Sequence, residues 1–272
     1  MDQEAIRLNW NPDLIQEVRK RRPLVHQITN EVTVNDCANI TLSCGASPVM
    51  AHAPEEVAEM AGWASTLVLN IGTLHAPQVE AMIQAGRSAN KKGIPVVLDP
   101  VGAGATSFRT ETAKKLLERI RISHLKGNAG EIATLAGERA QVRGVDSGHV
   151  DDIRTIAIKA AKKWGLTVIV TGEKDIITDG VKWAEVSNGH FLMGTITGTG
   201  CMCAPVVAAF AAVSKEPVSA AVSAMTTYGI AAEQAAESAK GPGSFRWKLF
   251  DALHSLDGAA VREYAQVEWG GA

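Results

Sequence analysis

The sequence predicts an α/β fold in which helices cover both faces of a mostly parallel β-sheet. Short runs of β-branched and aliphatic residues alternate with alanine-rich stretches that have helical periodicity. Glycine or polar turns separate the two kinds of segment. One segment, residues 175–190, instead contains two alternating runs joined by a tight turn, which indicates an antiparallel hairpin at a sheet edge.

The composition is that of a globular protein with no general affinity for polyanions. Hydrophobic residues make up 46% of the 272 residues, charged residues make up 21%, and the formal net charge is −2. This balance excludes a disordered chain and argues against nucleic-acid or membrane-surface binding. No linker composition divides the chain, so we expect one domain over residues 1–272.

The predicted elements of the first two thirds follow one another as strand, turn and helix. The clearest helix begins at Pro77, has apolar residues at helical spacing, and ends in two lysines and Gly93. In order we expect strand 66–70, helix 77–92, strand 95–99, helix 110–120, strand 122–126, helix 129–135, helix 152–164 and strand 167–171.

The last third is predicted to be helical, over residues 201–213, 218–238 and 245–255. The longest apolar run, 202–213, is shorter than the ~20 residues that a membrane-spanning helix needs, so it indicates a buried helix. The N-terminal residues have no apolar stretch of the signal-peptide kind, and the four cysteines form no CxxC pair. We therefore expect a cytoplasmic protein without disulfides.

The sharpest local feature is the segment 194–201 (GTITGTGC), which is followed at once by an apolar helix. Glycines and small hydroxyl residues allow successive backbone N–H groups to face one concavity, and the helix dipole adds positive potential there. A tight turn that binds nothing is the alternative. Cys201 lies in the first helical turn, where a thiol is favourably placed for chemistry. The loop is neither a Walker A motif nor a dinucleotide fingerprint.

Two further segments place polar residues at strand ends. Asp99 ends a buried strand and is followed by a glycine-rich turn, so it suits either a metal ion or a turn cap. Residues Lys126, Asn128 and Glu131 follow the next strand, where the last two have the spacing of a helix-capping box. Alternatively, Asp99 and Glu131 would together support Mg²⁺, with Lys126 near phosphate.

In combination, seven blocks of the sequence resemble the hydroxyethylthiazole kinases of the ribokinase-like superfamily. Each block alone is weak evidence, but all seven occur in the same order as in that family. The blocks are 26–36 (HQITNEVTVND), 46–50 (ASPVM), 69–74 (LNIGTL), 98–103 (LDPVGA), 127–131 (GNAGE), 170–172 (VTG) and 198–201 (GTGC).

The resemblance implies ATP-dependent phosphorylation of 4-methyl-5-(2-hydroxyethyl)thiazole in thiamine salvage, with Mg²⁺ as cofactor. It implies an anion hole at Gly198, Thr199 and Gly200 and a catalytic position at Cys201, where most of the superfamily has aspartate. The remaining roles are also implied by the resemblance: ATP binding by Lys126, Thr171 and Asn128, thiazole binding by Met50, Gly198, Asn30, Val32 and Gly72, and support of Mg²⁺ by Asp99 and Glu131.

The same resemblance implies a homotrimer with its sites between subunits. Lys126 occupies a position at which the family often has arginine, so a bidentate phosphate contact is lost while the charge is kept. Cys201 is expected to position the acceptor hydroxyl or to take its proton late, because a loose phosphoryl-transfer transition state needs little early deprotonation.

Three alternatives stay open at this point. The chain could phosphorylate another vitamin precursor, such as hydroxymethylpyrimidine or pyridoxal, although the N-terminal blocks and Cys201 argue against both. It could be a non-catalytic homologue that binds the same ligands. A nicotinamide-dependent enzyme is disfavoured because the early glycine fingerprint is missing.

Overall fold

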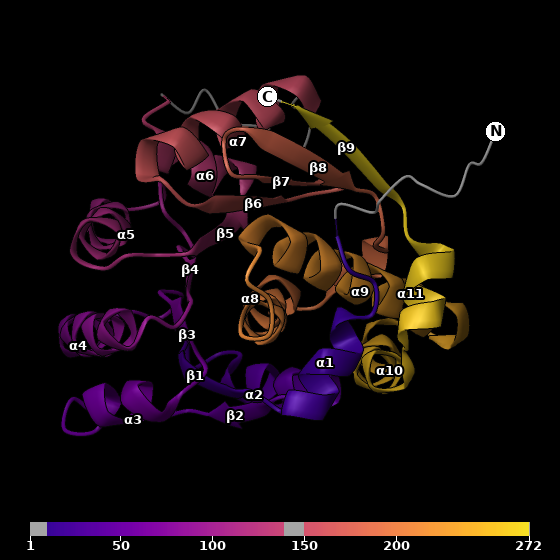
Figure 1. Cartoon of the computed structure of the whole chain (residues 1–272), viewed down its shortest axis with the longest axis horizontal. Helices are drawn as coiled ribbons and strands as arrows, with labels where there is room; N and C mark the ends of the chain where they lie inside the picture. The colour runs from indigo at the N-terminus through magenta and orange to yellow at the C-terminus, as the bar shows by residue number, and fades with distance from the viewer. Residues whose placement is uncertain (1–9, 139–149, 272) are drawn as a thin grey trace.

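The protein is built on one nine-stranded sheet with the strand order β2-β1-β3-β4-β5-β6-β7-β8-β9 (Figure 1). The computed structural model describes residues 10–138 and 150–271. The strands are β1 (Leu24–Ile28), β2 (Ser47–Val49), β3 (Thr66–Asn70), β4 (Val96–Asp99), β5 (His124–Asn128), β6 (Thr167–Thr171), β7 (Asp175–Thr178), β8 (Lys182–Val186) and β9 (Val267–Gly271).

Strands β1 to β6 run parallel to one another, and the pairs β6–β7, β7–β8 and β8–β9 at one end of the sheet are antiparallel. The predicted parallel sheet with an antiparallel hairpin is therefore confirmed. The hairpin β7–β8 is not outermost, however, because β9 pairs with β8 and forms the edge itself. Sequence reasoning missed β9 because it is short, half-exposed and ends in two glycines.

Helices cover both faces of the sheet, as expected (Figure 1). One layer holds α3 to α7, and the other holds α1, α2 and α8 to α11. The helices are α1 (Leu14–Arg21), α2 (Val34–Cys44), α3 (Val57–Trp63), α4 (Ala76–Lys92), α5 (Ser107–Arg119), α6 (Ala129–Ala136), α7 (Val150–Trp164), α8 (Thr199–Ala211), α9 (Pro217–Ser238), α10 (Pro242–Ser255) and α11 (Gly258–Tyr264), with a 3₁₀ turn, η3, at Phe191–Thr195.

Several predicted boundaries shift by a few residues, and two of these shifts have clear local reasons. Helix α5 begins three residues before the predicted start, because the side chain of Thr106 caps it by accepting from the backbone N–H of Arg109. Strand β5 begins two residues after the predicted start. Ser123, just before it, is held in the connection by hydrogen bonds between its hydroxyl and the backbone of Val96.

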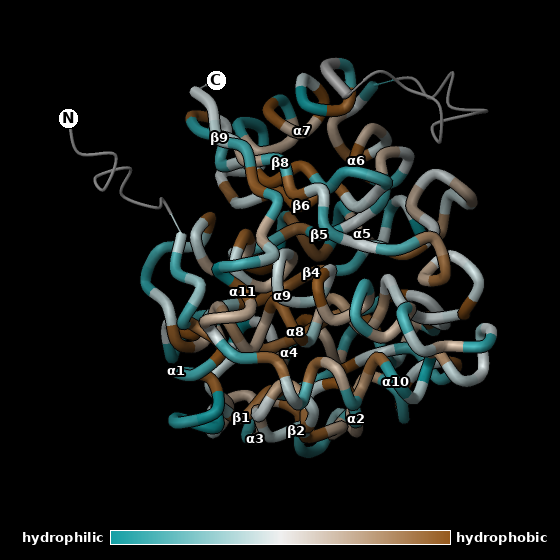
Figure 2. Tube along the Cα trace, turned by 90° about the vertical axis from the view of Figure 1, so that its right-hand side faces the viewer, coloured by the Kyte–Doolittle hydropathy of each residue, from teal (hydrophilic) through white to brown (hydrophobic). Residues whose placement is uncertain are grey.

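The central strands send alternate side chains into two separate apolar cores. Val68 and Val97 belong to the core shared with α8 and α9, whereas Leu67 and Leu98 belong to the core under α4 and α5. Figure 2 shows this hydrophobic interior along the central strands and α8. Two residues beyond Val68 and Val97, the alternation places the polar ends of β3 and β4 on the α8 side.

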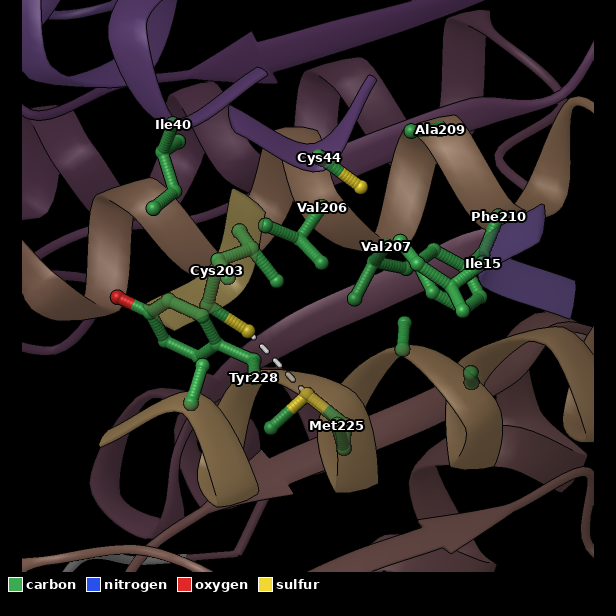
Figure 3. Packing of buried hydrophobic residues seen from close by; sticks show 14 of the residues in the cluster. Ile15, Ile40, Cys44, Cys203, Val206, Val207, Ala209, Phe210, Met225 and Tyr228 are labelled. Atoms are coloured by element: carbon green, nitrogen blue, oxygen red, sulfur yellow. Dashed lines mark hydrogen bonds between the residues drawn. The ribbon is translucent and has the colours of Figure 1, made fainter. Parts of the chain in front are cut away.

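Helix α8 is buried on nearly all sides, which confirms the predicted buried helix. Its side chains pack between α2 and α9 (Figure 3), and Cys203 contacts the sulfur of Met225 on α9 at 3.2 Å. At the first turn, the Tyr228 hydroxyl donates to the carbonyl of Thr199 at 3.0 Å. These contacts fix the start of α8 against α9. Within the described chain, no helix is long and apolar enough to cross a membrane.

Candidate active site

The carboxyl ends of β3, β4 and β5 bring three buried polar side chains together. Asn70 and Asp99 are register partners on adjacent strands, and the amide of Asn70 donates to the Asp99 carboxylate at 2.9 Å. The ammonium of Lys126 lies 3.3 and 3.4 Å from the two oxygens of that carboxylate. All three side chains are at most 4% exposed, so a charged pair lies in a water-poor site.

Burial and charge act against each other in this pair. Burial raises the pKa of Asp99 to about 6, although the nearby Lys126 ammonium opposes that rise. Burial, the largest single influence, would lower the pKa of Lys126, but the surrounding acidic groups, Asp99 first among them, together outweigh burial and raise it. Lys126 therefore stays protonated and provides a fixed positive charge at the sheet edge.

The N-terminus of α8 faces this lysine. A Cβ atom on Gly200 would lie 3.5 Å from the Lys126 ammonium, so the cation lies beside the first turn of α8. The helix begins at Gly198, whose φ of 97° lies in the left-handed region that favours glycine. No side chain of the described residues caps α8. The first backbone N–H groups of the helix are thus available to an anion, as the sequence predicts for Gly198, Thr199 and Gly200.

Cys201 completes the first turn of α8 and is only half-buried, whereas the other three cysteines are buried. The Asn30 amide donates to its sulfur at 3.3 Å. Burial raises the pKa of both Cys37 and Cys203 to about 12, so neither is a reactive thiol. Cys201 is consequently the cysteine at the site that is placed for chemistry.

The start of α6 differs, because side chains of its own first turn accept hydrogen bonds from its backbone N–H groups. Asn128 accepts from the backbone N–H of Glu131 at 2.9 Å, and Glu131 accepts from that of Asn128 at 2.8 Å, so the predicted capping box is confirmed. The second oxygen of Glu131 accepts from the backbone of Gly102 at 2.8 Å and ties the loop after β4 to α6. Thr171 lies beside Asn128 as its register partner at the end of β6.

The predicted acceptor-binding residues are distributed around Asn30. Gly72 packs against Asn30, because a Cβ atom on Gly72 would lie 2.9 Å from that of Asn30. Gly198 packs against Thr33, which lies with Asn30 on the loop between β1 and α2. Met50 follows β2 and is half-buried, and Val32 is 65% exposed. The structure therefore brings Asn30, Gly72, Gly198 and Cys201 together and leaves Val32 on the outer side of the loop.

Comparison with known proteins assigns the family. The family model described as "Hydroxyethylthiazole kinase family" matches residues 15–259. A "Hydroxyethylthiazole kinase" of Methanocella arvoryzae is 54% identical over 94% of this chain and 97% of its own length. The chain belongs to the hydroxyethylthiazole kinase family. It is therefore a kinase, and the family expected from the sequence motifs is confirmed.

Solved structures agree with this assignment. The "hydroxyethylthiazole kinase protein" of Pyrococcus horikoshii OT3 superposes with a TM-score of 0.88 at 47% identity, covering 94% of this chain and 97% of that one. A ribokinase-like superfamily protein of Enterococcus faecalis shares the fold at a TM-score of 0.65 and 13% identity, covering 94% and 95% of the two chains. The ribokinase-like fold is thus confirmed.

Two site residues of this hydroxyethylthiazole kinase family member were missed by sequence reasoning. Asn70 links Asp99 to Asn30 but had no role in the prediction. Arg109 on α5 donates to the carbonyls of Ile71, Val101 and Gly72 at 2.8–3.0 Å and clamps the loops after β3 and β4. A polar residue at the end of the otherwise apolar run TLVLN was the available signal for Asn70.

The carboxylates of Asp99 and Glu131 fit a hydrated cation better than a directly bound one. Every oxygen of the two groups already accepts a hydrogen bond from a neighbouring N–H or ammonium group. The described residues contain no group of three or more His, Cys, Asp or Glu side chains that could hold a metal ion. Because Mg²⁺ commonly keeps several waters and is bound through one or two carboxylates together with substrate phosphates, two carboxylates near the uncapped start of α8 would suit it.

Proposed function

We propose that the protein transfers the γ-phosphoryl group of ATP to the hydroxyl of 4-methyl-5-(2-hydroxyethyl)thiazole, producing the thiazole phosphate of thiamine salvage. The observation that carries this proposal is the uncapped start of α8, which lies beside a buried lysine and ends in a half-buried thiol. Phosphoryl transfer requires positioned positive potential more than covalent chemistry, and this arrangement supplies it.

The anion hole is built from the backbone at the start of α8. The N–H groups of Thr199, Gly200 and Cys201 would face the transferred phosphoryl group, and Lys126 would add a full positive charge. The water-poor surroundings strengthen these interactions relative to those in solvent. Thr171 and Asn128, at the ends of β6 and β5, would contact the nucleotide. Mg²⁺, held through water by Asp99 and Glu131, would supply further neutralisation of phosphate charge.

The acceptor hydroxyl would lie beside Cys201. The Asn30 amide donates to the sulfur and fixes its position, so that its free side can face the hydroxyl. Met50, Gly72 and Val32 would surround the thiazole ring, for which an adaptable thioether is a suitable apolar wall. As a thiol, Cys201 would orient the alcohol, and as a thiolate it would accept the alcohol proton while the oxygen–phosphorus bond forms and ADP leaves, a contribution of at most about 10²–10⁴-fold.

A homotrimer would close the site with a neighbouring subunit. Val32, Phe191 and Trp247 are 65%, 76% and 59% exposed, which is unusual for large apolar side chains. They lie on the β1–α2 loop, η3 and α10, and α10 contacts both η3 and α2, the helix that follows that loop. A subunit covering them would also cover the outer side of the β1–α2 loop. We place this enzyme in the cytoplasm, where ATP is available.

The function is tested by ADP release from Mg-ATP with three vitamin-precursor alcohols: the thiazole, hydroxymethylpyrimidine and pyridoxal. Turnover with the thiazole alone supports the proposal. Turnover with another alcohol would reassign the substrate, and thiazole binding without turnover would indicate a non-catalytic homologue. Mass determination in solution tests the trimer, and Phe191→Asp should then yield smaller species.

The role of Cys201 is tested by two substitutions. Cys201→Ala should lower kcat while leaving the fold intact. Cys201→Asp should keep substantial activity, because a carboxylate can accept the same hydrogen bond from Asn30 and a proton from the alcohol. Steady-state rates decide between outcomes, and complete inactivity of the Asp variant would refute a proton-accepting role at this position.

A further inference from the structure

A continuous series of hydrogen bonds joins the buried carboxylate of Asp99 to the thiol of Cys201. The Asn70 amide donates to Asp99 at 2.9 Å, and its oxygen accepts from the Asn30 amide at 3.0 Å. The second hydrogen of that Asn30 amide is directed to the sulfur of Cys201, at 3.3 Å. Asn70 itself is 1% exposed and lies outside the group of residues assigned to substrate or nucleotide.

The orientation of the Asn70 amide is fixed from three sides. Its oxygen accepts from the backbone N–H of Gly72 at 2.9 Å as well as from Asn30, and its nitrogen faces a carboxylate. A flipped amide would set its NH₂ group against two N–H donors and its oxygen against Asp99. Because buried polar groups cost about 1–3 kcal/mol when they lose their partners, the flipped form is strongly disfavoured.

The Asn30 amide is held by Thr33 on its oxygen side and by Asn70 on its nitrogen side. The Asn30 oxygen accepts from both the backbone N–H and the hydroxyl of Thr33, each at 3.0 Å. Its NH₂ group must therefore face Asn70 and Cys201. The sulfur of Cys201 consequently receives a hydrogen bond on this side, and its own proton or lone pair faces elsewhere in the site.

We propose that Asn70 is a positioning residue for phosphoryl transfer, which acts by holding the Asn30 amide so that it fixes the sulfur of Cys201. This inference rests on the proposed function. Asn70 does not touch substrate in this scheme. Without it, Asn30 keeps Thr33 on its oxygen side but loses the acceptor on its nitrogen side, so its NH₂ group and the sulfur that it contacts are held less firmly. A displacement of about 1 Å of a reacting group can reduce a rate by roughly 10²-fold.

The first test compares Asn70→Ala with Thr73→Val as a matched control. The Thr73 hydroxyl accepts from the backbone N–H of Glu31 at 3.0 Å. The control therefore also removes one hydrogen bond to the β1–α2 loop, but it leaves the hydrogen bonds between Asp99, Asn70, Asn30 and Cys201 intact. We expect kcat of Asn70→Ala to fall roughly 10- to 100-fold. The KM for Mg-ATP should change by less than about threefold, since Lys126 and the start of α8 are retained. The control should keep kcat within about twofold.

The second test is a double-mutant cycle with Asn30→Ala. If Asn70 acts through Asn30, adding Asn70→Ala to Asn30→Ala should lower kcat by less than about threefold more. Independent, multiplying effects would overturn the proposal, as would an Asn70→Ala variant with unchanged kcat. Should Asn70→Ala fail to fold, Asn70→Ser is measured with the same expectations. Failure of both to fold would assign Asn70 to structural support and overturn the proposal as well.

The outcome for the wild-type protein separates this inference from the proposed function. If the wild-type protein turns over the thiazole alcohol and the kcat of Asn70→Ala is unchanged, only the positioning role of Asn70 is overturned. A wild-type protein inactive towards the thiazole but active on another precursor would overturn the assigned substrate. The cycle is then run with that precursor and decides the role of Asn70 by the same criterion.

Discussion

Helices α6 and α8 begin at the same edge of the sheet, yet the first backbone N–H groups of α6 are capped by side chains and those of α8 are not. The start of α6 is closed by its own capping box, in which Asn128 and Glu131 satisfy each other's backbone N–H groups. The start of α8 has glycine at the capping position and no capping side chain among the described residues. Since both helix dipoles point positive potential at this edge, only the capping chemistry distinguishes them.

This difference is the reason why we propose α8, and not α6, as the anion-binding helix. At α6, the carboxylate of Glu131 already neutralises the positive potential and occupies the amides of Asn128 and Gly102. At α8, Lys126 adds to the potential instead. A helix start that lacks a cap, is fixed by packing and has a cation beside it has free backbone N–H groups that can bind an anion. A helix start with a complete capping box is a structural end.

Gly198→Ala should have the largest effect on activity. A Cβ atom would collide with the Thr33 side chain, and the φ of 97° is costly for alanine, so the first turn of α8 must move. Loss of an aligned oxyanion donor typically costs about 10²–10³-fold in kcat, and we expect a decrease of this size. Gly194→Ala is the control, because no atom lies within 4 Å of its added Cβ. Equal activity of the two variants would contradict the anion-hole assignment.

Lys126→Met should be the most destabilising substitution. It leaves the Asp99 carboxylate buried without its cation, a change that typically costs about 3–5 kcal/mol. Urea denaturation would measure the loss. Adding Asp99→Asn should restore much of the stability, because the uncompensated charge is removed, but it should not restore kcat. Recovery of activity in the double variant would show that the positive charge of Lys126 is dispensable for catalysis.

The fold and the location of the site were largely predictable from sequence because they depend on local patterns. Apolar strand runs and helix-capping types predict the parallel sheet and the start of α6. The blocks around Cys201 predict the anion hole before any coordinates are known. The structure adds a steric reason for Gly198, since a Cβ atom there would collide with the side chain of Thr33.

The rest depended on contacts between distant parts of the chain, which no local pattern reveals. Asn70 and Asn30 are forty residues apart, and their hydrogen bond exists only because β1 and β3 are neighbours. Likewise, β9 has a weak strand signal and is specified by pairing with β8. The Lys126–Asp99 pair requires β4 and β5 to be adjacent in register, which the order of strands along the chain suggests but does not fix.

Glu131→Gln should have an intermediate effect that falls mainly on the nucleotide side. The carboxylate accepts from Gly102 and Asn128 with separate oxygens, whereas glutamine offers only one acceptor. One backbone N–H then loses its partner, at a cost of about 1–3 kcal/mol. If Glu131 also supports hydrated Mg²⁺, the Mg²⁺ concentration for half-maximal rate should rise several-fold. A loss of stability with an unchanged Mg²⁺ requirement would leave Glu131 as a cap alone.

Substitutions of Asn128 should have the smallest effects, and they separate the two roles of this residue. Asn128→Ala removes the cap of α6 and should lower the free energy of unfolding by about 1 kcal/mol. Asn128→Asp keeps a good capping oxygen, so stability should be retained, but it adds a negative charge at the proposed nucleotide site. The KM for ATP should therefore rise in the Asp variant and change little in the Ala variant. The reverse pattern would mean that Asn128 contributes to nucleotide binding through its amide hydrogens, and that the start of α6 is not as closed as its capping box indicates.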